Sequence, residues 1–272
     1  MSSRWSRRNG YLSVTALIVL AIGWCLHIYG FGLGDSQWLS GWLLVSVIFV
    51  LMMYNGRKKI TFLPAIRNRT WLQLHLYVGL AALFLFLMHV QWRWPDGYLE
   101  VSLALLFVLI CASGVVGIFI SRLFARRLTH QGEQLIFERI PAFARTLRET
   151  ADGVVKESVD ATESTTLADF YIRTVAPFFG RPSFSPRHLF NDQRGFYRLS
   201  NELAAQERYM NDKEKEYTEE LLDLLKRKNA LDNQYTLQLT LKSWLFIHIP
   251  MTYSMVLVLL AHMLLVYGFG SV

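Results

Sequence analysis

The sequence contains few of the residues that mark a soluble, secreted or disulfide-stapled protein. Only 18% of its 272 residues are charged and 53% are hydrophobic, which is too apolar for an ordinary soluble domain. The two cysteines, Cys25 and Cys111, lie too far apart in a long chain to form a disulfide framework. The motif Cys-x-x-Cys-His is missing, which excludes covalently attached haem. This composition indicates a membrane protein.

The positive charge of the chain does not indicate nucleic acid binding. Lysine and arginine number 28 against 21 aspartate and glutamate. The stretch 125–241 is nevertheless close to neutral, with 17 basic and 18 acidic residues and no basic stripe for phosphates. The surplus lies beside the apolar runs, so we expect membrane lipid as a partner and no nucleic acid.

Five apolar runs are long enough to cross a bilayer, which takes roughly 20 helical residues. The first follows three arginines, is too long for a cleaved signal peptide and lacks a small-residue cleavage site, so it predicts a signal anchor. The predicted spans are 11–33, 38–54, 71–92, 98–121 and 243–267.

The charges that flank these spans predict their orientation. One side of the alternating spans carries ten basic residues, whereas the other carries Arg93 with three acidic residues. By the positive-inside bias the N-terminus is cytoplasmic and the C-terminus lies outside the inner membrane. The ten basic residues are Arg4, Arg7, Arg8, Arg57, Lys58, Lys59, Arg67, Arg69, Arg122 and Lys242.

The resulting fold class is an all-α membrane protein with five transmembrane helices and a helical cytoplasmic insertion. We expect a signal-anchor helix in 1–37, a four-helix bundle in 38–121 and 243–272, and the insertion in 122–242. Within the insertion the pattern predicts helices at 131–158, 166–179 and 195–241, separated by a loop at 180–194. The insertion lacks a phosphate loop, a dinucleotide fingerprint and a metal-ligand cluster.

Four histidines occur in duplicate within the spans. His75 precedes His89 by fourteen residues, and His248 precedes His262 by the same number. Fourteen helical residues rise roughly 21 Å and turn nearly four times, so both histidines of a helix face the same way. Ionisable side chains inside a membrane are rare and costly, so this pattern requires an explanation.

The paired spacing predicts two haems. The third and fifth spans run in the same direction, so His75 and His248 share the cytoplasmic depth while His89 and His262 share the outer depth. Two facing imidazoles can occupy both axial positions of a haem iron, whereas zinc would require four ligands converging at one depth. We therefore predict two non-covalent b-type haems with His75, His248, His89 and His262 as iron ligands. With both axial positions filled, electron transfer is the chemistry that remains.

Residues beside the histidines complete the predicted cofactor sites. Gly79 and Gly117, like Ser113 and Gly114, are small enough to let a porphyrin approach a helix, although small residues are also common wherever membrane helices pack. Arg93 for the outer haem and Arg69 for the inner one could pair with propionates, or could serve only as topology determinants. The predicted cofactor-binding set is thus the four histidines with Gly79, Gly117, Arg93 and Arg69. Catalytic residues are not predicted.

This arrangement resembles the ferric reductase and NADPH oxidase transmembrane domain, and it is similar to the dihaem bundle of quinone-linked cytochromes b. The likeness covers roughly 38–121 and 243–267 and depends mostly on the four histidines. The ferric reductase family implies six spans and a flavin domain, whereas this sequence ends after the fifth run. The resemblance therefore implies a separate electron donor or acceptor, such as a flavoprotein, a c-type cytochrome or quinone.

The sequence is compatible with three functions. The first is transmembrane electron transfer by the cytochrome b subunit of a membrane oxidoreductase, between a cytoplasmic or quinone-pool partner and an outer-face redox partner. The second is a self-contained, quinol-reactive cytochrome b enzyme. The third is a membrane-anchored scaffold whose insertion binds a partner, and it predicts a colourless protein.

Overall fold

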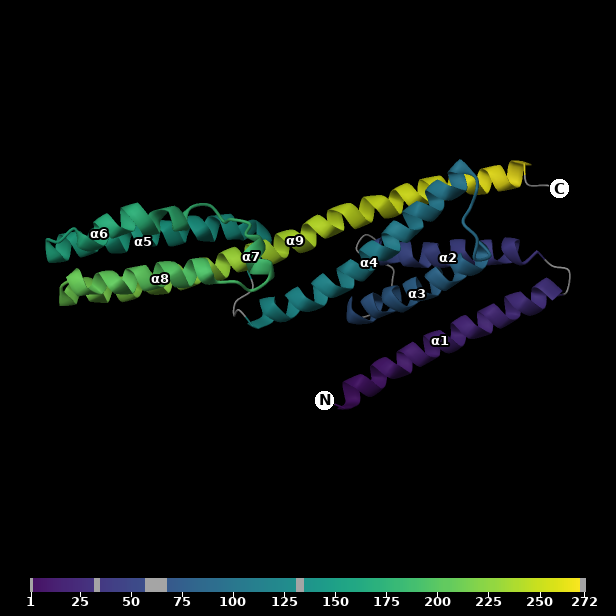
Figure 1. Cartoon of the computed structure of the whole chain (residues 1–272), viewed down its shortest axis with the longest axis horizontal. Helices are drawn as coiled ribbons and strands as arrows, with labels where there is room; N and C mark the ends of the chain where they lie inside the picture. Colours follow the sequence, from purple (N-terminus) through teal and green to yellow (C-terminus); the bar gives the residue numbers. More distant parts are fainter. Residues whose placement is uncertain (1, 32–34, 57–67, 131–134, 270–272) are drawn as a thin grey trace. The chain divides into compact units, whose positions relative to one another are not determined.

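The computed structural model describes residues 2–31, 35–56, 68–130 and 135–269. Within these ranges the chain is helical and forms no strand. Arg57, Lys58, Lys59 and Arg67 fall outside the described residues. Four long α-helices precede a series of shorter elements, and one very long helix ends the chain (Figure 1). The long helices are α1 (Ser2–Phe31), α2 (Ser36–Gly56), α3 (Asn68–His89), α4 (Tyr98–His130) and α9 (Asp212–Phe269).

Among the described residues, four helices are long and apolar enough to cross a membrane. They are α2, α3, α4 and α9, with candidate spans Ser36–Tyr54, Thr70–His89, Tyr98–Leu128 and Asp212–Phe269. The apolar stretch of α1, Thr15–Gly30, is shorter. The chain is thus an all-helical protein of membrane character, and a fifth span in α1 stays a prediction.

The chain divides into two compact units. Unit 1 comprises Met1–Gly114 with His248–Val272, and unit 2 comprises Val115–Ile247. Helices α4 and α9 each contribute residues to both units.

Unit 1 is built on the pair α2 and α3, which pack along their length, with α1 against both. Its buried cluster joins Ile48 of α2, Leu85 of α3, Ala104 of α4 and Met255 of α9. The rings of Phe86 and Phe107 stack with centroids 4.5 Å apart. These apolar contacts fix the two helices that carry the histidines.

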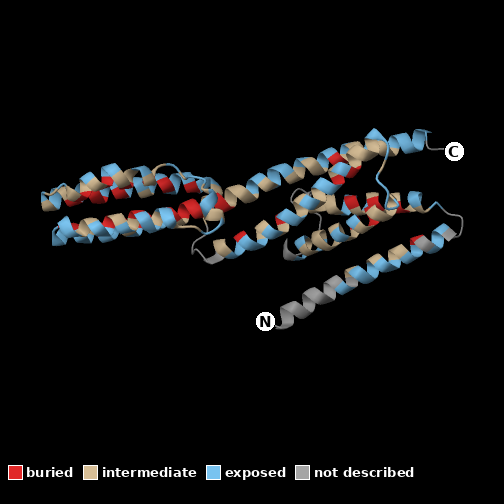
Figure 2. Ribbon diagram, viewed as in Figure 1, coloured by how far each residue is buried: buried red, intermediate tan, exposed pale blue. Residues whose placement is uncertain are grey.

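Unit 2 contains the shorter helices and a core of its own, whose buried residues appear red in Figure 2. Leu167, Val175, Leu221 and Leu225 are fully buried there. The elements are η1 (Phe137–Arg139), α5 (Ile140–Thr162), α6 (Thr166–Phe170), the π-helical turn η2 (Tyr171–Val175), η3 (Ala176–Phe179), α7 (Pro186–Leu189), α8 (Arg194–Gln206) and η4 (Glu207–Tyr209).

Three sequence predictions about helix bounds are wrong. Of the helix expected over 131–158, residues 131–134 fall outside the described part of the chain, Phe137–Arg139 form the 3₁₀ turn η1, and α5 begins at Ile140. The third span was expected to continue to residue 92, but α3 ends at His89. The single helix expected over 195–241 is broken between α8 and α9, because Asn211 and Glu214 cap the start of α9 reciprocally: each backbone N–H donates to the other's side chain, at 3.1 and 2.8 Å.

Candidate haem-binding site

The four histidines lie in two pairs in unit 1. His75 and His248 are near enough to interact electrostatically, and so are His89 and His262. The pairing is the one that the matched spacing predicts, because each pair joins one residue of α3 to one of α9. Within the described part of the chain, no three His, Cys, Asp or Glu side chains are grouped closely enough to hold a metal ion.

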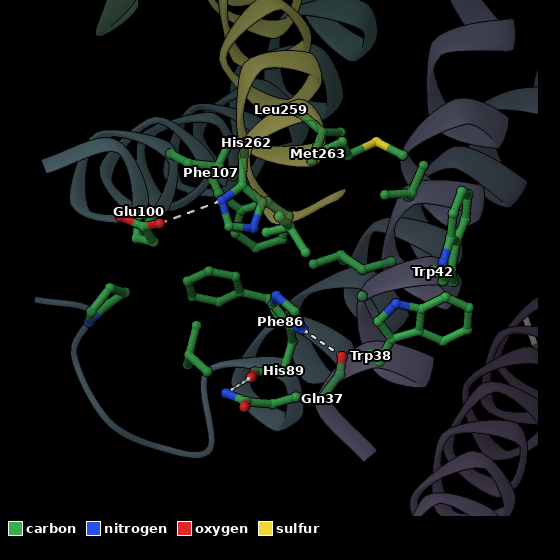
Figure 3. Close-up of a pocket in the computed structure, with 18 of the residues that line it drawn as sticks. Gln37, Trp38, Trp42, Phe86, His89, Glu100, Phe107, Leu259, His262 and Met263 are labelled. Carbon is green, nitrogen blue, oxygen red and sulfur yellow. Dashed lines mark hydrogen bonds and ion pairs between the residues drawn. The ribbon is translucent and has the colours of Figure 1, made fainter. Parts of the chain in front are cut away.

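His89 and His262 line a common cavity of about 530 Å³. Figure 3 shows both imidazoles projecting into this space, His89 from the end of α3 and His262 from α9. Most of the wall is apolar and includes Phe86, Phe107 and Leu259. Pockets of 300–1,000 Å³ with apolar walls and a few polar groups are typical of cofactor sites.

His89 is held in one orientation by the start of α2. Its Nδ1 donates to the backbone carbonyl of Gln37 at 3.1 Å and lies 3.4 Å from the hydroxyl of Ser40. The side-chain amide of Gln37 donates in turn to the backbone carbonyl of His89, at 3.4 Å. A ring that donates from Nδ1 presents Nε2 as a lone-pair donor, which is how most metal-ligating histidines are oriented.

Gly41 allows this close approach. A Cβ atom at residue 41 would lie 3.0 Å from Cε1 and 3.4 Å from Nδ1 of His89. The imidazole therefore packs directly against the backbone of α2, and any side chain at this position would push it away.

The end of α3 also fixes His89. The amide of Trp92 donates to the carbonyl of Leu87 at 3.1 Å, and that of Gln91 donates to Met88 at 3.1 Å. This is the Schellman arrangement, in which the residue after the helix adopts a left-handed conformation, here Gln91 with φ of 50°. His89 is accordingly the last residue of the helix.

The other three histidines have different surroundings. Nδ1 of His248 lies 3.1 Å from the hydroxyl of Ser113. Nδ1 of His262 faces Glu100, whose Oε1 is 3.7 Å away. The buried Nδ1 of His75 has no hydrogen-bond partner among the described residues, while its ring lies 5.0 Å from that of Tyr54.

The predicted accessory residues fall in different places. Arg93 lines the outer cavity. Gly79 adjoins open space, because a Cβ there would meet no atom within 4 Å. Gly117 lies instead against the indole of Trp244, which occupies the room that a side chain would take. Arg69 belongs to the first turn of α3, but its side chain is outside the described residues.

Sequence reasoning missed the contribution of α2. Gln37, Ser40 and Gly41 all contact His89 or its backbone. The order of the predicted spans contains a signal for this contact. The second and third spans are antiparallel neighbours, so the start of the second lies at the same membrane depth as the end of the third. The same argument applies to Glu100 at the start of α4, which approaches His262.

The residues present fit a haem held by two imidazoles. A cavity with apolar walls separates two histidines from different helices, and two of the four imidazoles have Nδ1 beside an oxygen that can fix the ring. No family model, curated protein or solved structure matches this chain.

Proposed function

We propose that the chain is the electron-transfer subunit of a membrane oxidoreductase and carries electrons across the membrane on two b-type haems. His75 with His248 would hold the inner haem, and His89 with His262 the outer one. When bound, each haem supplies a one-electron couple at iron. The observation that carries the proposal is the outer cavity, where His89 and His262 project into one space and Gln37 fixes the ring of His89.

The residues of the chain perform three tasks in this function. Imidazoles from α3 and α9 would hold each haem from two helices, and protein ligands on both sides would leave electron transfer as the chemistry of the group. The carbonyl of Gln37 and the hydroxyl of Ser113 orient two of the rings and raise their basicity as ligands. Phe86, Phe107 and Leu259 form part of the apolar wall of the outer site, and Arg93 in the same wall would supply a cation for a propionate.

The test is haem binding by purified protein. Reduced-minus-oxidised spectra should show low-spin b-type haem, at about two per chain, because each pair of imidazoles holds one iron. His262→Ala and His248→Ala should each remove about one haem per chain. His27→Ala is the matched control, since the proposal gives His27 no role, and it should leave haem content unchanged.

Two results would overturn the proposal. A colourless protein would support the scaffold function instead. Full haem content in both the His248 and His262 variants would mean that these histidines are not ligands.

A further inference from the structure

The loop between η3 and α8 in unit 2 is tightly organised. Its short helix α7 begins with Pro186, whose fixed φ suits a first helical position. The helix ends in a second Schellman arrangement. The backbone amide of Asp192 donates to the carbonyl of Arg187 at 2.9 Å, and the backbone amide of Asn191 donates to the carbonyl of His188 at 3.2 Å. Asn191 takes the left-handed conformation, with φ of 59°.

The loop is fastened to α4 by one side chain. The guanidinium of Arg127 donates to the carbonyls of Leu189 and His188, at 2.5 and 2.6 Å, and to the side chain of Asn191 at 3.1 Å. Two loop amides bond to α9: those of Ser183 and Ser185 donate to Asp232 and Thr236, at 3.4 and 3.3 Å.

Two aromatic side chains remain exposed on this fastened loop. Phe190 is 85% exposed and Phe184 is 47% exposed. Arg127 bonds to the residues on both sides of Phe190, so it fixes the backbone from which this ring projects. The loop thus exposes two large apolar rings within seven residues of sequence.

Three arginines occur in the same loop as these aromatic residues. Arg181, Arg187 and Arg194 are exposed. Asp192 is the one acidic residue between 181 and 194, and it lies 3.5 Å from Arg194. The loop therefore has a net positive charge, which suits an anionic surface.

The length of α4 sets the distance from Arg127 to the apolar stretch of that helix. Between Glu100 and Arg122 helix α4 carries no charged residue, and these 21 residues would span about 32 Å, close to the thickness of the hydrocarbon core. Arg127 lies five residues further, or about 8 Å along the helix, which is near the outer limit of the headgroup layer. The loop that Arg127 holds is within reach of that layer.

We propose that the loop 181–194 lies in the headgroup layer of the membrane that α4 crosses. Phe184 and Phe190 enter the interface, and Arg181, Arg187 and Arg194 contact the phosphates of anionic phospholipids. Aromatic rings and arginines are the side chains that favour this layer. The inference requires that α4 spans a membrane but does not depend on haem binding.

A depth measurement on the whole chain tests this proposal. A nitroxide is attached to Phe190→Cys in a Cys25→Ser, Cys111→Ser background, and the protein is placed in nanodiscs of phosphatidylcholine and phosphatidylglycerol. The control is Tyr209→Cys, because Tyr209 is 74% exposed and follows α8, whose 13 residues separate it from the loop. The rate at which oxygen collides with the nitroxide reports the exposure of the label to lipid. The collision rate of a water-soluble nickel complex reports its exposure to water.

The label at 190 should collide several-fold more with oxygen relative to nickel than the label at 209. Equal ratios at the two positions would overturn the proposal and leave the loop as a surface for a soluble protein partner. Protection of position 190 from both reagents would also overturn it, since protein rather than lipid would then cover the loop. Replacement of Arg187 and Arg194 by Gln should reduce the ratio at 190, and an unchanged ratio would overturn the role of anionic headgroups.

Discussion

The two units differ in the surroundings of their large apolar side chains. In unit 1 large apolar residues such as Leu257 and Leu264 are exposed, while His75, His89, His248 and His262 are at least partly buried. In unit 2 leucines such as Leu221 and Leu225 are buried. The difference teaches that the solvent determines which side chains turn inward, because lipid accepts leucine and water does not.

Unit 2 also buries one complete ion pair. Lys228 Nζ lies 2.8 and 2.6 Å from the two carboxylate oxygens of Asp232, and the two side chains are 1% and 4% exposed. The four paired histidines of unit 1, by contrast, are only partly buried. The polar groups inside the two units therefore have different partners, and substitutions in each unit can test whether those partners matter.

The largest effect is expected in unit 1, from Gly41→Val. The new side chain would displace the ring of His89 from Gln37, because a Cβ alone already lies 3.0 Å from Cε1. Haem content should fall from about two to about one per chain, since only the outer iron loses a ligand. Ser46→Val, at an exposed position of the same helix, is the control and should keep both haems. Normal haem content in the Gly41 variant would show that the orientation of His89 does not matter for binding.

The next effect is expected in unit 2, from Lys228→Leu. This change leaves the carboxylate of Asp232 buried without its cation, which should lower the free energy of unfolding by about 3–5 kcal/mol. Replacing both residues by leucine should restore most of the loss. Arg227→Leu is the matched control: its pair with Asp223 is exposed and should contribute less than about 1 kcal/mol.

Amide hydrogen exchange in α5 and α9 measures these differences. If Lys228→Leu and Arg227→Leu reduce protection equally, the buried pair has no special role in unit 2.

The smallest effect concerns the pH dependence of unit 2. The hydroxyl of Tyr171 donates to Asp152 at 2.5 Å, and burial together with this carboxylate raises the pKa of Tyr171 far above its usual range. The folded state thus keeps a proton that the unfolded chain loses near pH 10. Stability is fully present below pH 10 and should fall above it by up to about 1.4 kcal/mol per pH unit.

Thermal unfolding followed by circular dichroism between pH 8 and about pH 11 checks this expectation over the range in which tyrosine titrates. Tyr171→Phe should flatten the pH profile, whereas Tyr209→Phe, at an exposed position, should not. An equally steep fall in the Tyr171 variant would assign the pH dependence to other groups.

The helices that carry the candidate site could be predicted from the sequence because long apolar runs have one stable solution in a bilayer. The pairing of His75 with His248 and of His89 with His262 followed from spacing and direction alone. The part played by Gly41 could not be predicted in this way, because it depends on how closely α2 packs against α3. Periodicity along one helix contains no information about the distance to another.

The sequence contains a local signal for the helix break at residue 211. Asn211 and Glu214 have the spacing of a capping box, but they lie in a charged stretch that reads as continuous helix. Cap residues therefore decide where such a charged stretch begins a new helix.

The termination of α3 at His89 makes the two histidine pairs electrostatically unequal. Carbonyl groups at the end of a helix carry a partial negative charge, and His89 is the last residue of α3, whereas His75 lies well inside it. Asp35 and Glu100 add acidic groups to the wall of the outer cavity. If the two proposed haems are bound, these carboxylates and the helix end, set against the guanidinium of Arg93 in the same cavity, would favour the oxidised form of the outer iron.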